Sequence, residues 1–225
     1  GLGDVYKRQH ENYEKQILLK DTQYRALQAQ INPHFLYNTL NSINWMIRSG
    51  KNEEASEMLI SLGDLLRAAF KKEQLATVFE ELELARHYID IQKVRYRRRA
   101  EFLVEAEGDL EAYHVPRMIL QPLVENSINH GVDNSLNKCR ILVRVKENEE
   151  AQTMTLEVED DGPGMTEEEL EAVRNFTMVP KGNGIGLKNI RERLNLIFSD
   201  AVFEITSQPG KGTVVRIEIP KYGGK

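Results

Sequence analysis

Polar side chains and glycines gather in four short segments of the second half of the chain, in patterns that suit a phosphorylated ligand. The first segment is LQPLVENSINHG, residues 120–131, which brings Glu125, Asn126, Asn129 and His130 close together. On a helix Asn126 lies one turn from both Asn129 and His130, so the three side chains can converge on one ligand. A carboxamide oxygen is a hard ligand that suits Mg²⁺, and Mg²⁺ commonly bridges to phosphates.

The second segment, EDDGPGM, follows a run that reads as a strand. It places Gly162 and Gly164 directly after two carboxylates, Asp160 and Asp161. Glycines allow a ligand to approach the backbone closely. A carboxylate at the end of the strand can accept a hydrogen bond from an exocyclic amine such as that of adenine.

The third and fourth segments are glycine-rich. GNGIGL, residues 182–187, precedes a predicted helix, so its backbone N–H groups and the helix dipole can bind phosphate. A flexible loop is the alternative, and the pattern is not the dinucleotide fingerprint, because no strand closely precedes it. PGKGT, residues 209–213, reads as a hairpin turn whose Thr213 hydroxyl can reach a phosphate.

A candidate nucleophile, His34, lies in the first half, within QINPHFLYNTLNSINWMI at residues 30–47. If this segment is helical, two faces follow from its spacing. The polar face carries His34, Asn38, Asn41 and Trp45, and the apolar face carries Leu36, Leu40, Ile43 and Ile47. The imidazole is therefore expected to be accessible, although a lone surface histidine would show the same pattern.

Helices are predicted to position this histidine. Residues 10–30 read as a helical stalk, and the turn SGKN ends the histidine helix, with Gly50 available for a left-handed cap. A second helix is expected from about Glu53. Its apolar stripe is Ala55, Leu59, Leu62, Leu66 and Ala69. The two helices can form an antiparallel hairpin, and because one hairpin has little core, we expect a dimeric four-helix bundle.

The rest of the chain reads as a helix followed by an α+β region. Thr77 and Glu80 form a predicted capping box at the start of a helix over 77–98. Beyond it, strands are expected at 102–107, 138–146, 153–159, 202–207 and 213–219, and helices at 116–129, 167–175 and 187–198. This order favours a sandwich with helices on one face of a largely antiparallel sheet.

These predictions divide the chain into four parts. Residues 1–9 are interpreted as a non-native or truncated segment, 10–76 as dimerisation helices with the histidine, 77–100 as a connecting helix and 101–222 as the ligand-binding domain. We expect a hinge at 71–80, where the helical stripe is broken. We also expect the natural protein to continue upstream.

Composition narrows the function classes. The net charge of −5 gives no general attraction to nucleic acid, and we interpret the basic run 95–99 as a solvated helix end. The single cysteine, Cys139, excludes an intrachain disulfide and is expected to be a buried thiol. No apolar run approaches the ~20 residues that span a bilayer.

Taken in order, the four segments resemble the ATP-binding domain shared by histidine kinases, gyrase, Hsp90 and MutL, the GHKL superfamily with its Bergerat-type α/β sandwich. LQPLVENSINHG resembles its N box, DDGPG and GNGIGL its two glycine boxes, and GKGT the block that closes the site. The resemblance implies that ATP and Mg²⁺ bind at Asn126, Asn129, His130, Asp160, Gly162, Gly164, Gly182, Gly184, Gly186, Leu187 and Thr213. It makes Asn126 the Mg²⁺ ligand, Asp160 the adenine-reading carboxylate and the later glycines the phosphate cradle. Thr213 would support the Asp160 end of the pocket.

The first half selects a branch of this superfamily. NPHFLYNTLNSI is similar to the phosphoacceptor box of the LytS/YesM-type sensor histidine kinases, and YIDIQKVRYRRR also resembles the YesM side. The resemblance implies that His34 takes the phosphoryl group of ATP and passes it to an aspartate of a response regulator receiver domain. It further implies a homodimer that is the cytoplasmic portion of a bacterial membrane sensor, joined to the membrane only through an upstream segment.

Some positions depart from the better-known kinases. Phe35 stands after His34, where many of them carry an acidic base, so Glu125 is a candidate base. Asn129 stands in place of a lysine, for which His130 can partly substitute. Asn38 can position water for dephosphorylation of the regulator, or simply bond on the helix surface. The alternative functions are a GHKL-type ATPase, or a degenerate ATP-binding scaffold, that does not use His34.

Overall fold

The computed structural model describes residues 32–71, 73–176 and 186–221. The predicted stalk at 10–30 and the segment 1–9 lie outside these ranges. The helices are α2 (Pro33–Arg48), α3 (Asn52–Ala69), α4 (Val78–Arg95), α5 (Leu120–Asn126), the π-helix η1 (Ser127–Val132), α6 (Glu167–Arg174) and α7 (Leu187–Ile197). The strands are β1 (Leu75–Thr77), β2 (Ala100–Glu107), β3 (His114–Pro116), β4 (Cys139–Asn148), β5 (Thr153–Asp160), β6 (Val202–Gln208) and β7 (Gly212–Pro220).

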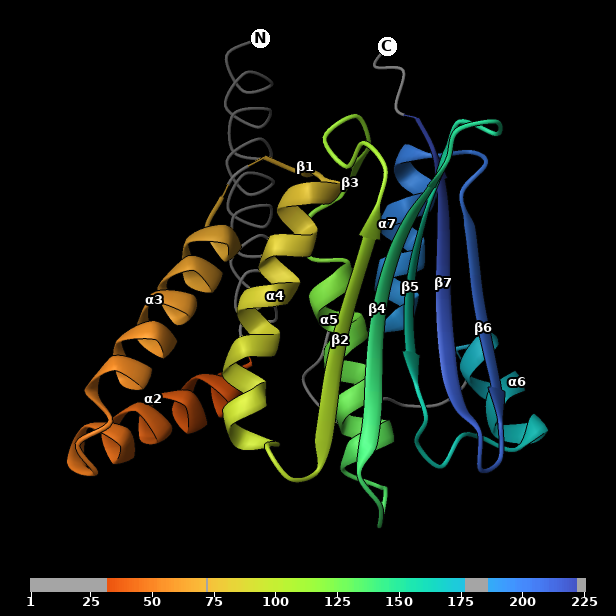
Figure 1. The fold of residues 1–225 in the computed structure, drawn as a ribbon. Coiled ribbons are helices and arrows are strands. Elements are labelled where there is room, and N and C mark those ends of the chain that lie inside the picture. Colours follow the sequence, from red (N-terminus) through yellow and green to blue (C-terminus); the bar gives the residue numbers. More distant parts are fainter. Residues whose placement is uncertain (1–31, 72, 177–185, 222–225) are drawn as a thin grey trace, which may run out of the picture.

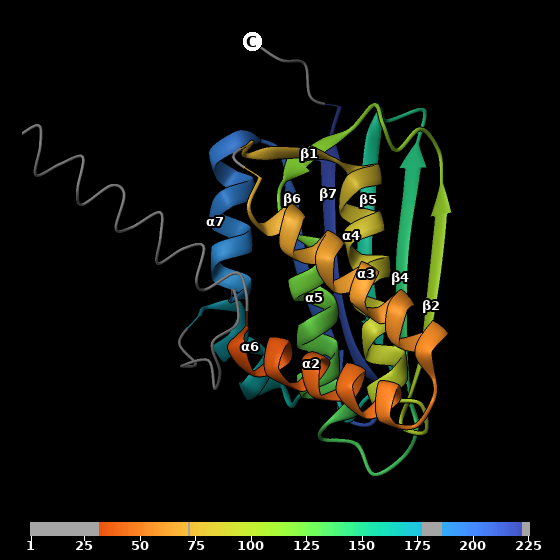
Figure 2. The same ribbon diagram turned by 90° about the vertical axis from the view of Figure 1, so that its left-hand side faces the viewer.

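The fold is α+β, as predicted, and it is arranged in layers (Figures 1 and 2). Five strands form one sheet in the order β2-β4-β5-β7-β6, in which only the β2–β4 pair is parallel. Helices α4, α5 and α7 lie along one face of this sheet, and the α2–α3 hairpin packs outside α4. The ligand-binding segments therefore sit on a sheet whose register is fixed by alternating buried residues.

The α2–α3 hairpin forms as expected, with Gly50 in the left-handed conformation at φ 76° between the helices. Its predicted apolar stripes are partly wrong. On α2 the buried side chains are Thr39, Ile43 and Met46, whereas Leu40 and Ile47 are exposed. On α3 the buried set is Ala55, Met58, Ser61, Leu62, Leu65 and Ala69, and Leu59 is exposed. The inward faces are rotated because the hairpin packs on α4, which the heptad reading did not include.

Helix α4 begins with the predicted capping box: Thr77 Oγ1 accepts from Glu80 N, and Glu80 Oε2 accepts from Thr77 N, each at 3.1 Å. Strand β1, immediately before it, pairs antiparallel with β3. The predicted hinge at 71–80 includes this ladder, and bending at β1 would break its pairing with β3. Helix α4 contacts both α3 and α5, so it joins the hairpin to the sheet layer.

The segment 116–132 differs most from its prediction as a helix over 116–129. Pro116 ends strand β3, Met118 has φ 59°, and the helix starts only at Leu120. After Asn126 the backbone widens into a π-turn, in which Asp133 N donates to Ile128 O at 2.9 Å. The π-turn is stabilised by tertiary contacts around Gly131 and is not visible in a period count.

Two smaller predictions have different outcomes. Cys139 is buried in β4, as expected. The basic run 95–99 is not only a solvated helix end, because Arg99 Nη2 donates to Val132 O at 2.8 Å and so ties the end of α4 to η1.

Candidate functional site

Asp160, at the end of β5, is the central buried acid of the predicted nucleotide site. It is 4% exposed, and its Oδ1 accepts from Gly162 N at 3.1 Å. Burial raises the pKa of its carboxyl, while hydrogen bonds from Gly162, Ser127 and the Thr213 backbone lower it. The carboxylate is thus held in a fixed orientation, as recognition of an amine requires.

Glycines allow the backbone to pack closely around Asp160. A Cβ atom at Gly131 would lie 2.9 Å from Asp160 Oδ1, and one at Gly162 would lie 2.5 Å from the Cα of Gly131. Gly212 has φ 86°, and a side chain there would collide with the backbone oxygen of Asp160. Gly164, at φ 67°, is confined in the same way by Gln208 O. Close backbone approach therefore explains the glycine spacing of the second segment.

Thr213 lies opposite Asp160 in the β5–β7 register, so its predicted place beside this acid is confirmed. Its Oγ1 is 2.9 Å from Ser207 Oγ. Ser207 Oγ in turn accepts from Met165 N at 2.9 Å and lies 2.8 Å from Gly212 O. This network joins the β6–β7 turn to the chain that leaves Asp160.

Asn126 ends α5 and is half-buried, whereas Asn129 and His130 are exposed on the π-turn. Their predicted convergence rested on α-helical spacing, which the π-turn changes. Within the described ranges there is no group of three or more His, Cys, Asp or Glu residues that could hold a metal ion. A single carboxamide fits Mg²⁺ that is otherwise bound by phosphates and water, so the Asn126 donor suits that ion.

The second glycine box lies largely outside the described residues, which include neither Gly182 nor Gly184. Gly186 is the N-cap residue of α7, and Leu187 is the first residue of this helix. The predicted helix start after the glycine loop is therefore confirmed. Its free N–H groups and the helix dipole can bind a phosphate.

His34 is exposed in the first turn of α2, as its predicted accessibility required. The Asn38 amide nitrogen lies 3.2 Å from His34 Nδ1 and 3.3 Å from Nε2. Asn32 caps the helix, because its Oδ1 accepts from His34 N at 3.0 Å. The ring next to His34, Phe35, packs on Tyr88 of α4 at 5.0 Å between centroids.

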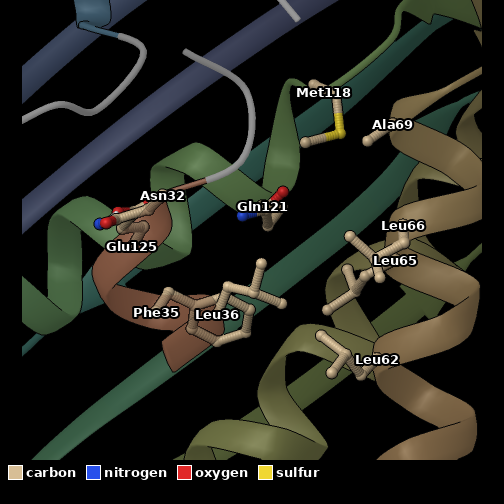
Figure 3. Close-up of a pocket in the computed structure, with 10 residues that line it drawn as sticks. All are labelled: Asn32, Phe35, Leu36, Leu62, Leu65, Leu66, Ala69, Met118, Gln121 and Glu125. Atoms are coloured by element: carbon tan, nitrogen blue, oxygen red, sulfur yellow. Dashed lines mark hydrogen bonds between the residues drawn. The ribbon is translucent and has the colours of Figure 1, made fainter. Parts of the chain in front are cut away.

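The same Asn32 joins the histidine helix to the nucleotide half of the protein. Its Nδ2 donates to Glu125 Oε1 at 3.2 Å, across 93 positions of sequence (Figure 3). Burial raises the pKa of Glu125, and the hydrogen bond from Asn32 lowers it. The candidate base, Glu125, is thus a partly buried acid next to the candidate metal ligand. Two hydrogen bonds, both made by the Asn32 side chain, connect it to the backbone N–H of His34.

Three residues of this site were not found from the sequence. Asn32 reads only as a helix-start residue, and Ser127 and Gly131 lie within the first segment without an assigned role. Ser127 is buried and bonds to Asp160, and Gly131 packs over the same acid. The signal available in the sequence was the small size of both residues beside polar neighbours, which permits close packing.

Two family models match the chain. The histidine kinase model matches residues 22–100, and the model described as histidine kinase-, DNA gyrase B- and HSP90-like ATPase matches residues 114–223. The boundary between them falls near β2, where the helical region gives way to the sheet. Together they account for the hairpin and for the nucleotide site.

Individual relatives show the same likeness. Sensor histidine kinase YesM of Bacillus subtilis is 41% identical over 93% of this chain and 35% of the relative, and sensor protein LytS of Bacillus anthracis is 33% identical over 100% and 39%. The chain thus spans little more than a third of these relatives. The histidine kinase domain of Erythrobacter litoralis EL346 shares the fold, with a TM-score of 0.50 and 20% identity over 89% of this chain and 94% of that one. No helix in the described ranges is long and apolar enough to cross a membrane.

Proposed function

Because this chain belongs to the LytS/YesM-type sensor histidine kinases, we propose that it is their catalytic portion, which phosphorylates His34 from Mg-ATP. The observation that carries the proposal is the Asn32 amide, which caps the histidine helix and bonds to Glu125. The residue next to Glu125 is Asn126, the candidate Mg²⁺ ligand. A nucleophile and a nucleotide site are thus joined through one side chain.

The residues divide the work of phosphoryl transfer. The neutral imidazole of His34 attacks the γ-phosphorus, the bond to the ADP oxygen breaks, and the proton leaves the ring for a base, for which Glu125 is the candidate. Asp160 accepts from the adenine amine, and the start of α7 at Gly186 receives the phosphates. Mg²⁺, held by Asn126, would neutralise phosphate charge when bound.

We extend the proposal to the partners. The phosphoryl group passes from His34 to an aspartate of a response regulator receiver domain, as the family resemblance implies. A second copy of the chain covers the exposed apolar residues of the hairpin, which include Tyr37, Leu40 and Ile60. We also propose, from the family resemblance, that this portion is joined to a membrane-bound sensing segment.

The test is labelling with γ-labelled ATP and Mg²⁺, in which the protein is compared with His34→Gln and Asn126→Ala. We expect an acid-labile label that both variants lose. His87→Gln is the matched control, because His87 lies on α4 beside Asp64 and away from the proposed transfer. An acid-stable label would instead indicate a serine kinase, which transfers phosphate to a hydroxyl side chain, and ATP consumption that persists without His34 and without a label would support the ATPase alternative.

A further inference from the structure

A buried turn, residues 117–120, lies between the helices that carry the two halves of the nucleotide site. It leads directly into α5, which ends at Asn126, and it packs against α7, which begins after the glycine loop. Met118 in this turn has φ 59°, a left-handed conformation that strains a residue other than glycine. Such strain persists only where surrounding contacts impose it.

Glu81 of α4 accepts hydrogen bonds from the backbone N–H groups of this turn. The carboxylate is 1% exposed, and its two oxygens accept the backbone N–H groups of Met118 and Ile119 at 2.8 Å and of Leu120 at 3.2 Å. The N–H groups of Ile119 and Leu120 are donors at the start of α5 that no intrahelical carbonyl can satisfy, and that of Met118 directly precedes them. Glu81 therefore caps α5 from a different helix, 37 positions away in sequence.

Arg193 of α7 donates hydrogen bonds to the backbone carbonyls of the same turn. Its Nη2 donates to Met118 O at 2.9 Å, and its Nη1 donates to Arg117 O. Burial lowers the pKa of this guanidinium, and the charge of Glu81 opposes that shift. The backbone of Met118 is thus fixed on both sides: its N–H donates to Glu81, and its carbonyl accepts from Arg193.

The side chain of Met118 points toward the hairpin, away from Glu81 and Arg193. It lines a cavity of about 30 Å³ between α5 and the hairpin, with Phe35, Leu36 and Ala69 (Figure 3). Arg117 extends the junction, because its Nε donates to Glu73 O at 2.8 Å and its Nη2 lies 3.6 Å from Glu80 Oε2. The turn therefore contacts the hairpin, α4, α5 and α7 together.

We propose that Glu81 and Arg193 are positioning residues for the phosphoryl transfer: by holding Met118 in the left-handed conformation, they fix α5 and α7 relative to each other. Asn126 on α5 and the phosphate-binding start of α7 then face one ligand at the correct separation. Neither residue contacts the nucleotide in this scheme. The inference rests on the proposed function, since it concerns the site at which that function places ATP.

The test combines Glu81→Gln with Met118→Gly, because glycine adopts the left-handed conformation without a carboxylate to enforce it. We measure the Kd for Mg-ATP, the rate of His34 labelling at saturating ATP and the thermal midpoint of each variant. Glu81→Gln leaves at least one N–H of the turn without an acceptor, and we expect a Kd about tenfold higher. In the Met118→Gly background the same change should raise the Kd less than about threefold.

A purely structural role for Glu81 predicts a different pattern. The thermal midpoint would fall while the Kd of the folded protein stayed constant, or the Kd would rise by the same factor in both backgrounds, and either result would overturn the inference. Glu83→Gln is the matched control, because Glu83 is a half-buried acid on α4 paired with Arg86. If Glu81→Gln does not fold, Arg193→Lys provides the second test, since lysine keeps the charge but cannot make both carbonyl contacts. Absence of ATP binding by the unmodified protein would overturn the proposed function itself.

Discussion

The proposed site contains a buried acid, Asp160, and a partly buried one, Glu125, and each is stabilised by different hydrogen-bond donors. Asp160 receives hydrogen bonds from Gly162, Ser127 and Thr213, whereas Glu125 has Asn32 as its bonded partner. Burial raises both pKa values, so each acid is ionised only at the cost of desolvation. Substitutions at these positions should therefore change ligand binding and pH dependence before they change the fold.

Asp160→Asn should weaken ATP binding by about 10- to 100-fold, because the charged acceptor for the adenine amine is lost while the side-chain shape is kept. Calorimetric titration with Mg-ATP measures this change. Asp161→Asn is the control: Asp161 is exposed and accepts from Arg140 N, a contact that asparagine can retain. Equal losses in the two variants would contradict the role of Asp160.

Asn32→Ser should separate the link to Glu125 from the cap of α2, because serine can still accept from His34 N but does not extend to Glu125. Removal of the amide donor raises the pKa of Glu125 further. A base must be ionised, so the acidic limb of the His34 labelling rate should move to higher pH.

The pH dependence of stability gives an independent check on Asn32→Ser. The folded-state pKa of Glu125 lies above its unfolded value, so its contribution to stability is fully present below the unfolded pKa and is lost as pH rises through the folded pKa. This loss should grow in Asn32→Ser. Glu125→Gln should abolish the difference between the two backgrounds. If the stability profile moves in Asn32→Ser while the acidic limb of the labelling rate stays in place, Glu125 is not the base.

At the scale of elements, the site depends on how strands and helices end. The β5–β7 pair delivers Asp160 and Thr213 to the same level, and the turn before β7 folds back over this acid. Helix α5 continues as a π-turn so that Gly131 can pack there. Both features bring backbone, rather than side chains, against Asp160.

Gly212→Ala should therefore be far more damaging than Gly210→Ala. Both glycines have positive φ, which costs alanine about 1 kcal/mol. Around Gly210 there is no atom within 4 Å of the added Cβ, whereas at Gly212 the Cβ collides with the backbone of Asp160 and Asp161. Denaturant titration should show a loss of several kcal/mol for Gly212→Ala alone, together with weakened ATP binding; equal losses would refute the packing argument.

Features set by neighbouring residues could be predicted from the sequence, and features set by distant contacts could not. The Thr77 capping box and the Gly50 turn depend on a few adjacent residues, and the strand alternation around Asp160 was also legible. The hydrogen bond from Asn32 to Glu125 and the hydrogen bonds from residues 118–120 to Glu81 join positions far apart in sequence, so they depend on the tertiary fold. The hairpin stripes were misread for the same reason: their partner, α4, comes later in the chain.

At the scale of the whole molecule, the hairpin presents two different surfaces. One packs on α4, and the other leaves apolar side chains in solvent. On α2 and α3 these exposed residues are Tyr37, Leu40, Trp45, Ile47, Leu59 and Ile60. A patch of this kind on a helical hairpin is typical of an interface between copies.

Leu40→Lys combined with Ile60→Lys should weaken the proposed dimer at least about tenfold, because each change removes roughly 1.5–3 kcal/mol of apolar burial. Sedimentation equilibrium measures the change. Leu196→Lys, an exposed apolar position on α7 distant in sequence from the hairpin, should leave association unchanged. A protein that remains dimeric in the double variant, or is monomeric without it, would contradict this interface.

The buried thiol of Cys139 provides a chemical probe of local opening in the sheet. The thiol is 1% exposed in β4, between β2 and β5, and its pKa is raised to about 12 by burial and by Asp161. Little thiolate exists at neutral pH in the closed protein, so an alkylating reagent reacts mainly when opening exposes this end of β4. The alkylation rate of the Cys139 thiol therefore measures how often this region opens. ATP bound at the proposed site should lower that rate by mass action.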